Sequence, residues 1–297
     1  MTSPPLLTIE PLLKRLDPAL PVLIAGPTAS GKSSLALHIA RQQGGTIINA
    51  DASQVYACWR VLTARPSVEE EALAPHRLYG HVPAGEEYSA GHWLRDLRGI
   101  LTTEQRPIIV GGTGLYFSAL TVGLAEIPPT PADVRRQADA MDHPVMLDEI
   151  DAPTRARIDT QNPARVQRAW EVLRSTGRGL AAWQDETERP LLPVPPAQGV
   201  VVNAPKEWLT PRIERRFDQM IDAGALEEVR AVLPTYDPAL PAHRAIGAPE
   251  LIRHLRGEAG FTEARNAAIV ATRQYAKRQR TWFRSKMHSW MKFDPAG

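Results

Sequence analysis

The sequence predicts an α/β fold, in which a parallel sheet flanked by helices forms the core and a mainly helical domain is inserted. In residues 1–122, short apolar runs alternate with amphipathic stretches, a pattern typical of parallel strands joined by helices. Two proline-rich segments then bracket an arginine-rich stretch with helical spacing. We therefore expect a first part of the core at 1–122, a helical insertion at 123–199, and a second part with basic C-terminal helices at 200–297.

The first elements follow the chain in order. Residues 21–26 (PVLIAG) are a short apolar run that ends in glycine, which predicts a buried strand entering a turn. In residues 33–43 the apolar side chains recur at helical spacing, and two glycines follow as a stop signal. Residues 46–50 (TIINA) predict a second strand. Residues 107–110 (PIIV) predict a third, followed by a glycine turn and another helix.

The pattern changes after residue 123. Residues 126–134 (EIPPTPADV) form one proline-rich joint and residues 189–199 (RPLLPVPPAQG) a second. Between them, Val166, Ala169, Trp170 and Leu173 make an apolar helix face, with Arg165 and Arg168 off that face. These arginines could contact phosphate, or they could simply form a solvated helix face. Residues 200–205 (VVVNAP) then predict a strand and residues 212–233 a helical segment.

Bulk composition is that of an ordinary globular protein with a sizeable core: 297 residues, 43% hydrophobic, and a net charge of +2. No apolar run is long enough to span a membrane, and the N-terminus lacks a secretory pattern, so we expect a cytoplasmic protein. We also expect a monomer. The single Cys58 excludes a disulfide framework or a cysteine zinc cluster within one chain.

Charge is unevenly distributed. Residues 264–293 carry many cations, interleaved with aromatic side chains, and no acid. Such a segment suits a polyanion such as nucleic acid. A solvated helix face is the alternative that the residues leave open.

The most specific local motif is a phosphate-binding loop. Residues 26–33 (GPTASGKS) fit the pattern G-x-x-x-x-G-K-[ST] between a predicted strand and a predicted helix, which makes the core a P-loop core. Its backbone N–H groups are expected to cradle phosphate, with Lys32 on the diphosphate and the Ser33 hydroxyl on Mg²⁺. The motif indicates phosphate binding without establishing hydrolysis. The predicted diphosphate-binding residues of the loop are Gly26, Pro27, Thr28, Ala29, Ser30, Gly31, Lys32 and Ser33.

Asp51 is the second notable residue, because it comes directly after the second strand. Its carboxylate could hold Mg²⁺, accept a proton, or cap a following helix. A kinase or ATPase would place an acid after the strand at 107–110, yet that strand leads into GGTG. Since parallel strand ends open onto one crevice, Asp51 and Thr113 are both expected to face the phosphate loop.

Five motifs together carry a resemblance to a known family. They are GPTASGKS, D-x-x-Q-V-Y at 51–56, YSA at 88–90, VGGTGLY at 110–116 and ATRQYAKRQRTWFR at 271–284. In this order and spacing the chain resembles the bacterial tRNA dimethylallyltransferases, also called tRNA isopentenyltransferases. The likeness runs from about residue 21 to about residue 290.

The resemblance implies transfer of a dimethylallyl group from dimethylallyl diphosphate to the exocyclic amine of the adenosine 3′-adjacent to the anticodon in tRNA. It implies a phosphate loop that holds the diphosphate rather than hydrolysing ATP, with Mg²⁺ as cofactor. The implied catalytic residues are Asp51 as general base, Thr113 and Lys32. The motif R-x-x-x-R-x-x-x-M, here Arg212, Arg216 and Met220, implies that Arg216 contacts the diphosphate.

The resemblance also implies a set of tRNA contacts. They are Asp51, Ala52, Ser53, Gln54, Thr113, Arg135, Ala164, Arg165, Val166, Gln167, Arg168, Arg244, Ala245, Ile246, Gly247, Ala248, Pro249, Lys277, Arg278, Gln279, Arg280, Thr281, Trp282, Phe283 and Arg284. Two departures matter. Ala52 stands where the family usually has serine, with Ser53 one residue later, and GAPE at 247–250 replaces G-Y-[KR]-[EQ].

Three other functions share parts of these features. A P-loop kinase for a small metabolite fits the phosphate loop but leaves the basic segments without a purpose. A non-catalytic RNA-binding protein explains the basic segments and leaves the loop idle. An enzyme that prenylates free adenine nucleotides would share the core, and the helical insertion argues against it.

Overall fold

The structure is a computed structural model that describes residues 6–104 and 106–296. In this part of the chain, seven strands form one sheet in the order β1-β7-β6-β2-β5-β3-β4, and every neighbouring pair is parallel. The strands are β1 (Leu6–Leu7), β2 (Val22–Ala25), β3 (Thr46–Asn49), β4 (His76–Arg77), β5 (Pro107–Gly111), β6 (Gln198–Val202) and β7 (Met291–Phe293).

The chain divides into two compact units. Residues 1–121 and 192–297 form the core unit, and residues 122–191 form the helical unit. The helices of the core unit are α1 (Ile9–Arg15), α2 (Lys32–Gln43), α3 (Val68–Leu73), α4 (Ala90–Leu101), α5 (Gly114–Thr121), α11 (Lys206–Asp222), α12 (Ala225–Val232), α13 (Ala248–Leu255) and α14 (Phe261–Lys286), with short 3₁₀ turns η1 (Leu233–Thr235) and η2 (Pro241–Arg244). Those of the helical unit are α6 (Ala132–Asp139), α7 (His143–Glu149), α8 (Ala152–Arg157), α9 (Pro163–Thr176) and α10 (Leu180–Asp185).

The insertion is shorter at its C-terminal end than the predicted 123–199. Residues 192–199 belong to the core unit. Backbone bonds explain this, because Leu192 N–H donates to the Leu120 carbonyl at 3.1 Å and Gln198 N–H donates to the Pro21 carbonyl at 2.9 Å. The proline-rich sequence therefore returns along the core before β6 begins.

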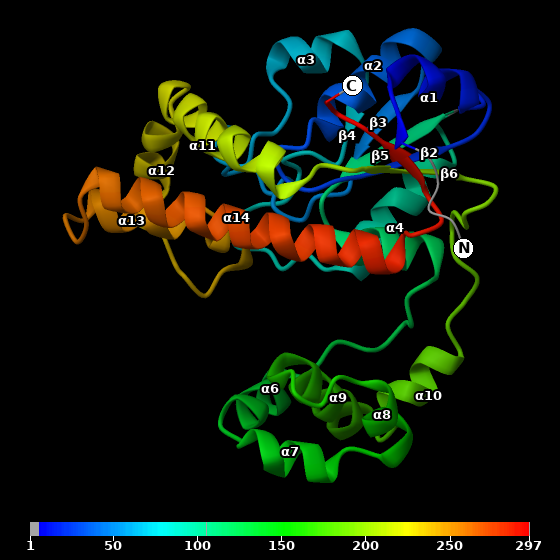
Figure 1. The fold of residues 1–297 in the computed structure, drawn as a ribbon. Coiled ribbons are helices and arrows are strands. Elements are labelled where there is room, and N and C mark those ends of the chain that lie inside the picture. Colours follow the sequence, from blue (N-terminus) through cyan, green and yellow to red (C-terminus); the bar gives the residue numbers. More distant parts are fainter. Residues whose placement is uncertain (1–5, 105, 297) are drawn as a thin grey trace. The chain divides into compact units, whose positions relative to one another are not determined.

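The central strands are buried on both faces, as expected for a parallel sheet covered by helices. All residues of β2, β3 and β5 are buried. Figure 1 shows α2 and α4 on opposite sides of this sheet. On the α2 side, Leu35 and Ile39 pack with Ile24, Ile47 and Ile108 in one apolar cluster. The predicted strands at 21–26, 46–50 and 107–110 are confirmed to within a residue or two at their ends.

The C-terminal half of the core unit is a group of helices around α14, the long orange-to-red helix in Figure 1. The predicted helical segment at 212–233 is two helices, because the chain breaks at Gly224, which adopts a φ of 97°. The basic C-terminal region is largely one 26-residue helix, α14. Its buried face includes Ala268 and Phe283, while Lys277 and Arg284 are exposed.

The helical unit, green in Figure 1, has its own small core. The predicted apolar face of α9 is confirmed for Val166, Ala169 and Trp170, which are buried, while Leu173 is half-buried. The Trp170 indole N–H donates to Glu149 Oε2 at 2.6 Å, so the polar end of this buried ring is satisfied. The unit thus has the internal packing of an independent module.

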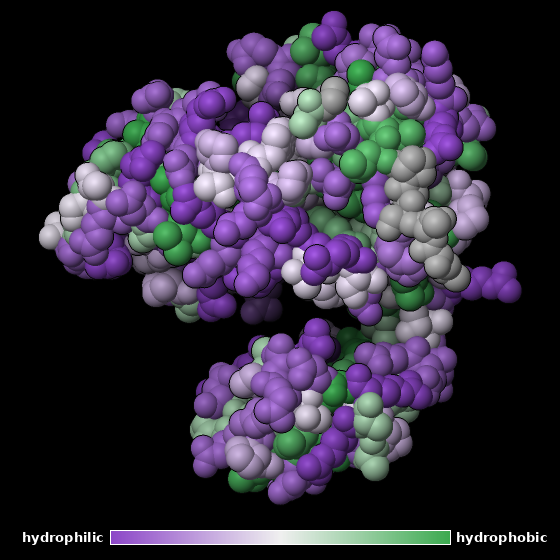
Figure 2. All heavy atoms as spheres, viewed as in Figure 1, coloured by the Kyte–Doolittle hydropathy of each residue, from purple (hydrophilic) through white to green (hydrophobic). Residues whose placement is uncertain are grey.

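Hydrophilic residues cover most of the face shown in Figure 2, and hydrophobic residues appear there in small groups. Among the described residues, no helix combines the length and the apolar character that crossing a membrane requires.

A substitution at Gly111, at the end of β5, tests the close pairing of β5 with β3. An added Cβ would lie 2.0 Å from the Ala50 carbonyl oxygen, which is backbone and cannot turn away. We expect Gly111→Ala to lower the free energy of unfolding by about 1–3 kcal/mol, the usual cost of overpacking. Gly99 in α4 is the control, since its added Cβ meets nothing within 4 Å. Gly99→Ala should instead raise stability by about 0.5–1 kcal/mol. Urea denaturation measures both, and equal stability of the two variants would contradict this packing.

Candidate active site

The phosphate loop joins β2 to α2, as the sequence predicts. Gly31 adopts a φ of 84° directly before the first helical residue, Lys32, and Ala29 also has a positive φ of 60°. A Cβ on Gly26 would lie 2.7 Å from Ser30 Oγ, so the loop needs glycine there to close tightly. The result is a compact turn that presents the N-terminus of a 12-residue helix, a favourable position for an anion.

A cationic pocket of about 510 Å³ lies against this loop. Besides residues 29–34 it is lined by Arg65, Arg212, Arg215 and Arg216, together with Glu70. Guanidinium groups bind phosphate oxygens through pairs of N–H donors, and Lys32 adds a point charge. We call this the diphosphate pocket, because its charge and size suit two linked phosphates.

Lys32 is buried, with 8% of its surface exposed. Burial, the largest cause, lowers the pKa of Lys32 to about 8, while the negative charge of Asp51 raises it and the positive charge of Arg216 lowers it further. Its ammonium group lies 3.5 Å from the Pro27 carbonyl oxygen. A lysine held this way is poised to gain a strong anionic partner.

Arg212, Arg216 and Met220 lie at four-residue spacing on one face of α11. Arg212 lines the diphosphate pocket and donates from Nε to the Ala29 carbonyl at 3.2 Å. Arg216 lines both this pocket and a second one, and Met220 lines only the second. Burial lowers the pKa of Arg216, against the opposing effect of Asp51. The helix face therefore leads from one pocket into the other.

The second pocket, of about 430 Å³, contains Asp51. We call it the acceptor pocket. Its apolar lining comes from Leu62, Ile213, Phe217, Met220 and Ile246, and its polar lining includes Ser53, Gln54 and Tyr88. Lys32 and Arg216 line both pockets. A molecule with an anionic head and a short apolar tail could therefore lie across the two.

Asp51 is buried, with 7% exposure, and one of its oxygens is already bound. Oδ1 accepts the Ser53 backbone N–H at 3.1 Å and the Ser53 hydroxyl at 2.7 Å. Residues 52–55 form a turn rather than a helix, so the helix-cap alternative for Asp51 is wrong. The other oxygen, Oδ2, would lie 3.0 Å from a Cβ added to Gly112. Oδ2 has no hydrogen-bond partner within the described part of the chain and is the oxygen left for chemistry.

Ser53 supplies the hydroxyl that Ala52, the residue directly after the acid, lacks. The bond from Ser53 Oγ to Asp51 Oδ1 fixes the carboxylate from the next position along the turn. The departure at Ala52 therefore leaves the acid with a hydroxyl partner.

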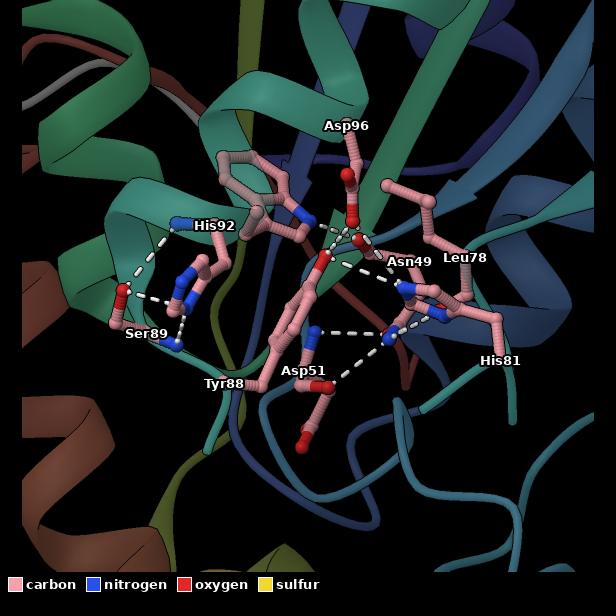
Figure 3. A network of polar contacts seen from close by, with 9 residues as sticks. Asn49, Asp51, Leu78, His81, Tyr88, Ser89, His92 and Asp96 are labelled. Atoms are coloured by element: carbon pink, nitrogen blue, oxygen red, sulfur yellow. Dashed lines mark hydrogen bonds and ion pairs between the residues drawn. The ribbon is translucent and has the colours of Figure 1, made fainter. Parts of the chain in front are cut away.

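The backbone around Asp51 is held by the network in Figure 3. The Asn49 side chain accepts the Asp51 N–H at 2.8 Å and donates to the Asp51 and Leu78 carbonyls, both at 3.0 Å. Behind it, the Trp93 indole N–H donates to the Asn49 carbonyl at 2.7 Å. These bonds connect the end of β3 to β4 and α4, so that the acid sits on a rigid support.

Tyr88, the aromatic residue of the YSA motif, is held in place beside the acceptor pocket. Its hydroxyl donates to Asp96 Oδ2 at 2.6 Å and lies 3.2 Å from His81 Nε2 (Figure 3). Its ring stacks on His92, with centroids 5.9 Å apart. Both burial and Asp96 raise the pKa of Tyr88, so it stays a neutral phenol at ordinary pH.

Thr113 lies behind Asp51. Its hydroxyl oxygen accepts the Ala52 N–H at 2.9 Å, and its own N–H donates to the Ala50 carbonyl at 3.1 Å. The structure thus brings Thr113 to the acid as expected, where it fixes the residues on either side of Asp51. Gln54 also lines the pocket, and its Nε2 donates to the Thr63 and Ala64 carbonyls, both at 2.8 Å, which leaves Oε1 to accept.

The predicted tRNA contacts of the core unit fall into exposed and buried groups. Arg244, Lys277, Arg278, Thr281 and Arg284 are exposed, and Arg244 and Arg278 line the acceptor pocket. Ile246, Pro249, Arg280 and Trp282 are partly exposed. The buried members support the surface from beneath; they are Ala245, Gly247, Ala248, Gln279 and Phe283.

The helical unit shows the same division. Ala164 and Arg165 are exposed, whereas Val166 is buried in the core of the unit. Arg168 donates to Thr130 Oγ1 at 2.7 Å and is half-buried. Arg135 pairs with the buried Glu171 at 2.9 Å, and Gln167 donates to the same carboxylate at 3.0 Å. Arg165 is the least restrained cation of this group.

Sequence reasoning missed Arg65 and Arg215 in the diphosphate pocket and Tyr275 in the acceptor pocket. The segment that carries Arg65 is placed from far along the chain. Glu228 on α12 accepts three successive backbone N–H groups from it, those of residues 60–62, at 2.5, 3.1 and 2.8 Å. No local pattern reports such a contact. Arg215, by contrast, lies within the R-x-x-x-R motif, directly before Arg216.

Comparison with known proteins settles the family. A family model described as IPP transferase matches residues 54–286, and one described as isopentenyl transferase matches residues 21–80. The chain belongs to the IPP transferase family.

Curated members of this family are close relatives. A tRNA dimethylallyltransferase of Roseobacter denitrificans is 66% identical and covers 94% of this chain and 100% of its own length. One of Cereibacter sphaeroides is 62% identical, covering 94% of this chain and 90% of its own. The crystal structure of a tRNA isopentenylpyrophosphate transferase from Bacillus halodurans is 27% identical, with a TM-score of 0.68 over 93% of this chain and 90% of that one. The parallel sheet with flanking helices is thus the fold of the IPP transferases.

The lowered pKa of Lys32 predicts pH-dependent binding of a diphosphate. The anion binds the protonated amine, so the apparent dissociation constant should rise as pH increases through about 8, the pKa of Lys32. Well above that pH the rise should approach about tenfold per unit. Lys32→Arg is the control, because a guanidinium stays charged throughout. Calorimetric titration with dimethylallyl diphosphate from pH 6.5 to 10 measures both proteins. Parallel profiles for the two would show that Lys32 does not meet the anion.

Proposed function

We propose that this IPP transferase moves the dimethylallyl group of dimethylallyl diphosphate onto the exocyclic amine of the adenosine 3′-adjacent to the anticodon in tRNA. One observation carries the proposal. The diphosphate pocket and the acceptor pocket share Lys32 and Arg216, and Asp51 lines the acceptor pocket. A leaving group and a nucleophile can therefore meet at one point. The names of the curated relatives, tRNA dimethylallyltransferase, support tRNA as the acceptor and a dimethylallyl group as the group transferred.

The reaction places opposite demands on the two pockets. The allylic C–O bond breaks and its electron pair leaves with the diphosphate, while the adenine nitrogen forms a C–N bond to the same carbon. Lys32, Arg216 and the loop N–H groups stabilise the charge that develops on the diphosphate. The apolar side chains of the acceptor pocket surround the electron-poor allyl group and exclude water, which would otherwise capture it.

We assign Asp51 as the general base that takes the proton lost by the adenine amine. Oδ2 is the unbound oxygen and Oδ1 is fixed by Ser53, so the carboxylate is both available and oriented. The influence of Asp51 on the pKa of Lys32 and of Arg216 places it within electrostatic range of two cations. Positive charge there disfavours a divalent metal on the same carboxylate. The unbound Oδ2 is the feature that favours the base over the magnesium ligand.

Mg²⁺ is proposed as the cofactor of the diphosphate. Ser33 is exposed at the N-terminus of α2 and, with Glu70, lines the diphosphate pocket. The serine hydroxyl and the glutamate carboxylate both offer oxygen ligands of the kind Mg²⁺ prefers. No group of three or more acidic, histidine or cysteine side chains in the described residues could hold a metal alone. These residues fit an ion held chiefly by the substrate, with Ser33 as a protein ligand. When bound, the ion would neutralise charge on the departing diphosphate.

Transfer to tRNA requires the target base to be extruded from its stacked loop into the acceptor pocket. Gln54 Oε1 offers an acceptor to such a base, since its amide hydrogens are already committed to the backbone of residues 63 and 64. Arg244 and Arg278, at the same pocket and exposed, are suited to the neighbouring phosphates.

The function is tested by incubating the protein with dimethylallyl diphosphate, Mg²⁺ and unmodified tRNA, followed by nucleoside mass spectrometry. The expected product is an adenosine heavier by one dimethylallyl group, formed with release of diphosphate. Modification of free adenosine monophosphate instead of tRNA would favour the nucleotide-prenylating alternative. Transfer of phosphate from ATP, without prenyl transfer, would favour the kinase.

Asp51→Asn keeps the shape of the side chain and removes its basicity. We expect the single-turnover rate to fall by about 10²–10⁴-fold, the usual contribution of a general base, while both substrates still bind. Measuring rate and dimethylallyl diphosphate affinity across a magnesium titration separates the two roles of the acid. Affinity lost in the variant and partly restored by extra Mg²⁺ would make Asp51 a metal ligand. Asp222→Asn, which changes an exposed carboxylate at the end of α11 that lines neither pocket, controls for loss of charge alone.

Arg165 and Arg168 test the role of the helical unit. Replacing both with alanine should weaken tRNA binding and reduce the slope of log K against log salt, by about 0.7–0.9 for each lost phosphate contact. Affinity for dimethylallyl diphosphate should stay unchanged. Arg155→Ala is the matched control, an exposed arginine of the same unit paired with Asp148. Fluorescence anisotropy at several salt concentrations gives the slopes, and an unaltered slope would assign both arginines to a solvated face.

A further inference from the structure

Gln279 stands apart from the other polar residues of α14 because it is buried, with 4% exposure. Its neighbours Arg278 and Arg280 reach solvent to differing extents, whereas its own amide points into the core unit. Oε1 accepts the Thr28 N–H at 2.8 Å, and Nε2 donates to the Gly112 carbonyl at 2.9 Å. One amide thus joins α14 to two separate turns.

Both turns belong to the site. Thr28 is part of the phosphate loop and lines the acceptor pocket. Gly112 precedes Thr113, whose hydroxyl oxygen accepts the Ala52 N–H directly after the base. A Cβ on Gly112 would lie 2.2 Å from Gln279 Nε2 and 3.0 Å from Asp51 Oδ2. The amide and the carboxylate therefore flank the same glycine.

We propose that Gln279 is a positioning residue for the transfer reaction, which sets the separation between the phosphate loop and Asp51 through its bonds to Thr28 and Gly112. The proposal rests on the proposed function, since it concerns the same site. It replaces the tRNA contact that the family resemblance implies for Gln279. A side chain that is 4% exposed, with both amide ends bound to backbone, is poorly accessible to RNA.

The position of Gln279 on α14 gives its two hydrogen bonds a second consequence. Exposed cations of the same helix, Lys277 and Arg278, lie within two residues of Gln279. RNA bound by those cations holds the helix that carries the amide. Acceptor binding and the alignment of the reacting groups therefore act through one rigid element.

Two variants test the proposal. Gln279→Met has a similar length and no hydrogen-bonding amide, so it breaks both bonds with little change in packing. Gln279→Glu keeps an acceptor for the Thr28 N–H but replaces the donor with an oxygen beside the Gly112 carbonyl and Asp51. Gln274→Ala, an exposed glutamine of the same helix, is the matched control. Each protein is assayed for thermal unfolding, for affinity toward pyrophosphate and an anticodon stem-loop RNA, and for single-turnover rate at saturating RNA.

We expect Gln279→Met to lower the single-turnover rate by about 10–100-fold, as for a misplacement of reacting groups by about 1 Å. RNA affinity should change by less than about twofold, because no RNA contact is lost. In Gln279→Glu the added negative charge should move the acid limb of the pH–rate profile to higher pH, because a like charge beside Asp51 disfavours the charged form of a carboxylate. The other charged or titratable groups that act on Asp51 are unchanged in all variants; they are Lys32, Arg216, Tyr79, Tyr116 and Tyr275.

Three results would overturn the proposal. One is a wild-type rate in a folded Gln279→Met protein. The second is RNA affinity lost by tenfold or more with a normal rate at saturating RNA, which would make Gln279 an RNA contact. The third is a pH–rate profile of Gln279→Glu that coincides with the wild type, which would leave only a structural role. A wild-type protein that modifies no tRNA would refute the proposed function, a result separate from all three.

Discussion

The site depends on the backbone pairing that joins the carboxyl ends of β2, β5 and β3. The Gly26 N–H donates to the Gly111 carbonyl at 3.2 Å, and the Ala50 N–H donates to the Val110 carbonyl at 2.8 Å. Because the three strands are adjacent and parallel, their following loops leave the sheet at the same edge. The phosphate loop, Asp51 and the glycine turn therefore meet at this edge of the sheet, and the Gln279 amide adds a side-chain link between the two turns. The close contact between β5 and the segment after β3 requires glycine at position 111, because a side chain there would meet the backbone of Ala50.

The second constraint is electrostatic. The diphosphate pocket gathers Lys32 and four arginines around a helix N-terminus, with Glu70 as an acid among its lining. Burial is the largest cause of the lowered pKa values of Lys32, Arg65 and Arg216, and repulsion from neighbouring cations lowers them further. An anionic ligand would relieve that repulsion on binding. The charge of the pocket therefore favours an anion over a neutral ligand.

The features that sequence alone predicts are those that local pattern encodes. The phosphate loop is readable because glycine, lysine and serine must occur at fixed spacing, and the central strands are readable because both their faces are apolar. Asp51 was correctly placed at a strand end, yet its role as a helix cap was excluded only by the turn at residues 52–55. The short strands β1, β4 and β7, each of two or three residues, carry too little pattern to be predicted. The segment that leads to Arg65 is placed by Glu228 and the Gln279 amide by Thr28, and both partners lie far away in the sequence. A basic helix likewise predicts exposure for all its polar residues, although one of them faces inward.

The position of Ser53 shows that a motif residue can shift along the sequence while its interaction with Asp51 is kept. The family pattern has its hydroxyl one residue after the aspartate, and here that position is Ala52. Ser53 still places a hydroxyl 2.7 Å from Asp51 Oδ1, because successive residues of a tight turn can reach the same oxygen. A search that demands serine at the first position would score this chain as deficient. The hydroxyl comes from a later residue but occupies the same place beside Asp51. Such a site is therefore better described by distances between atoms than by a sequence motif.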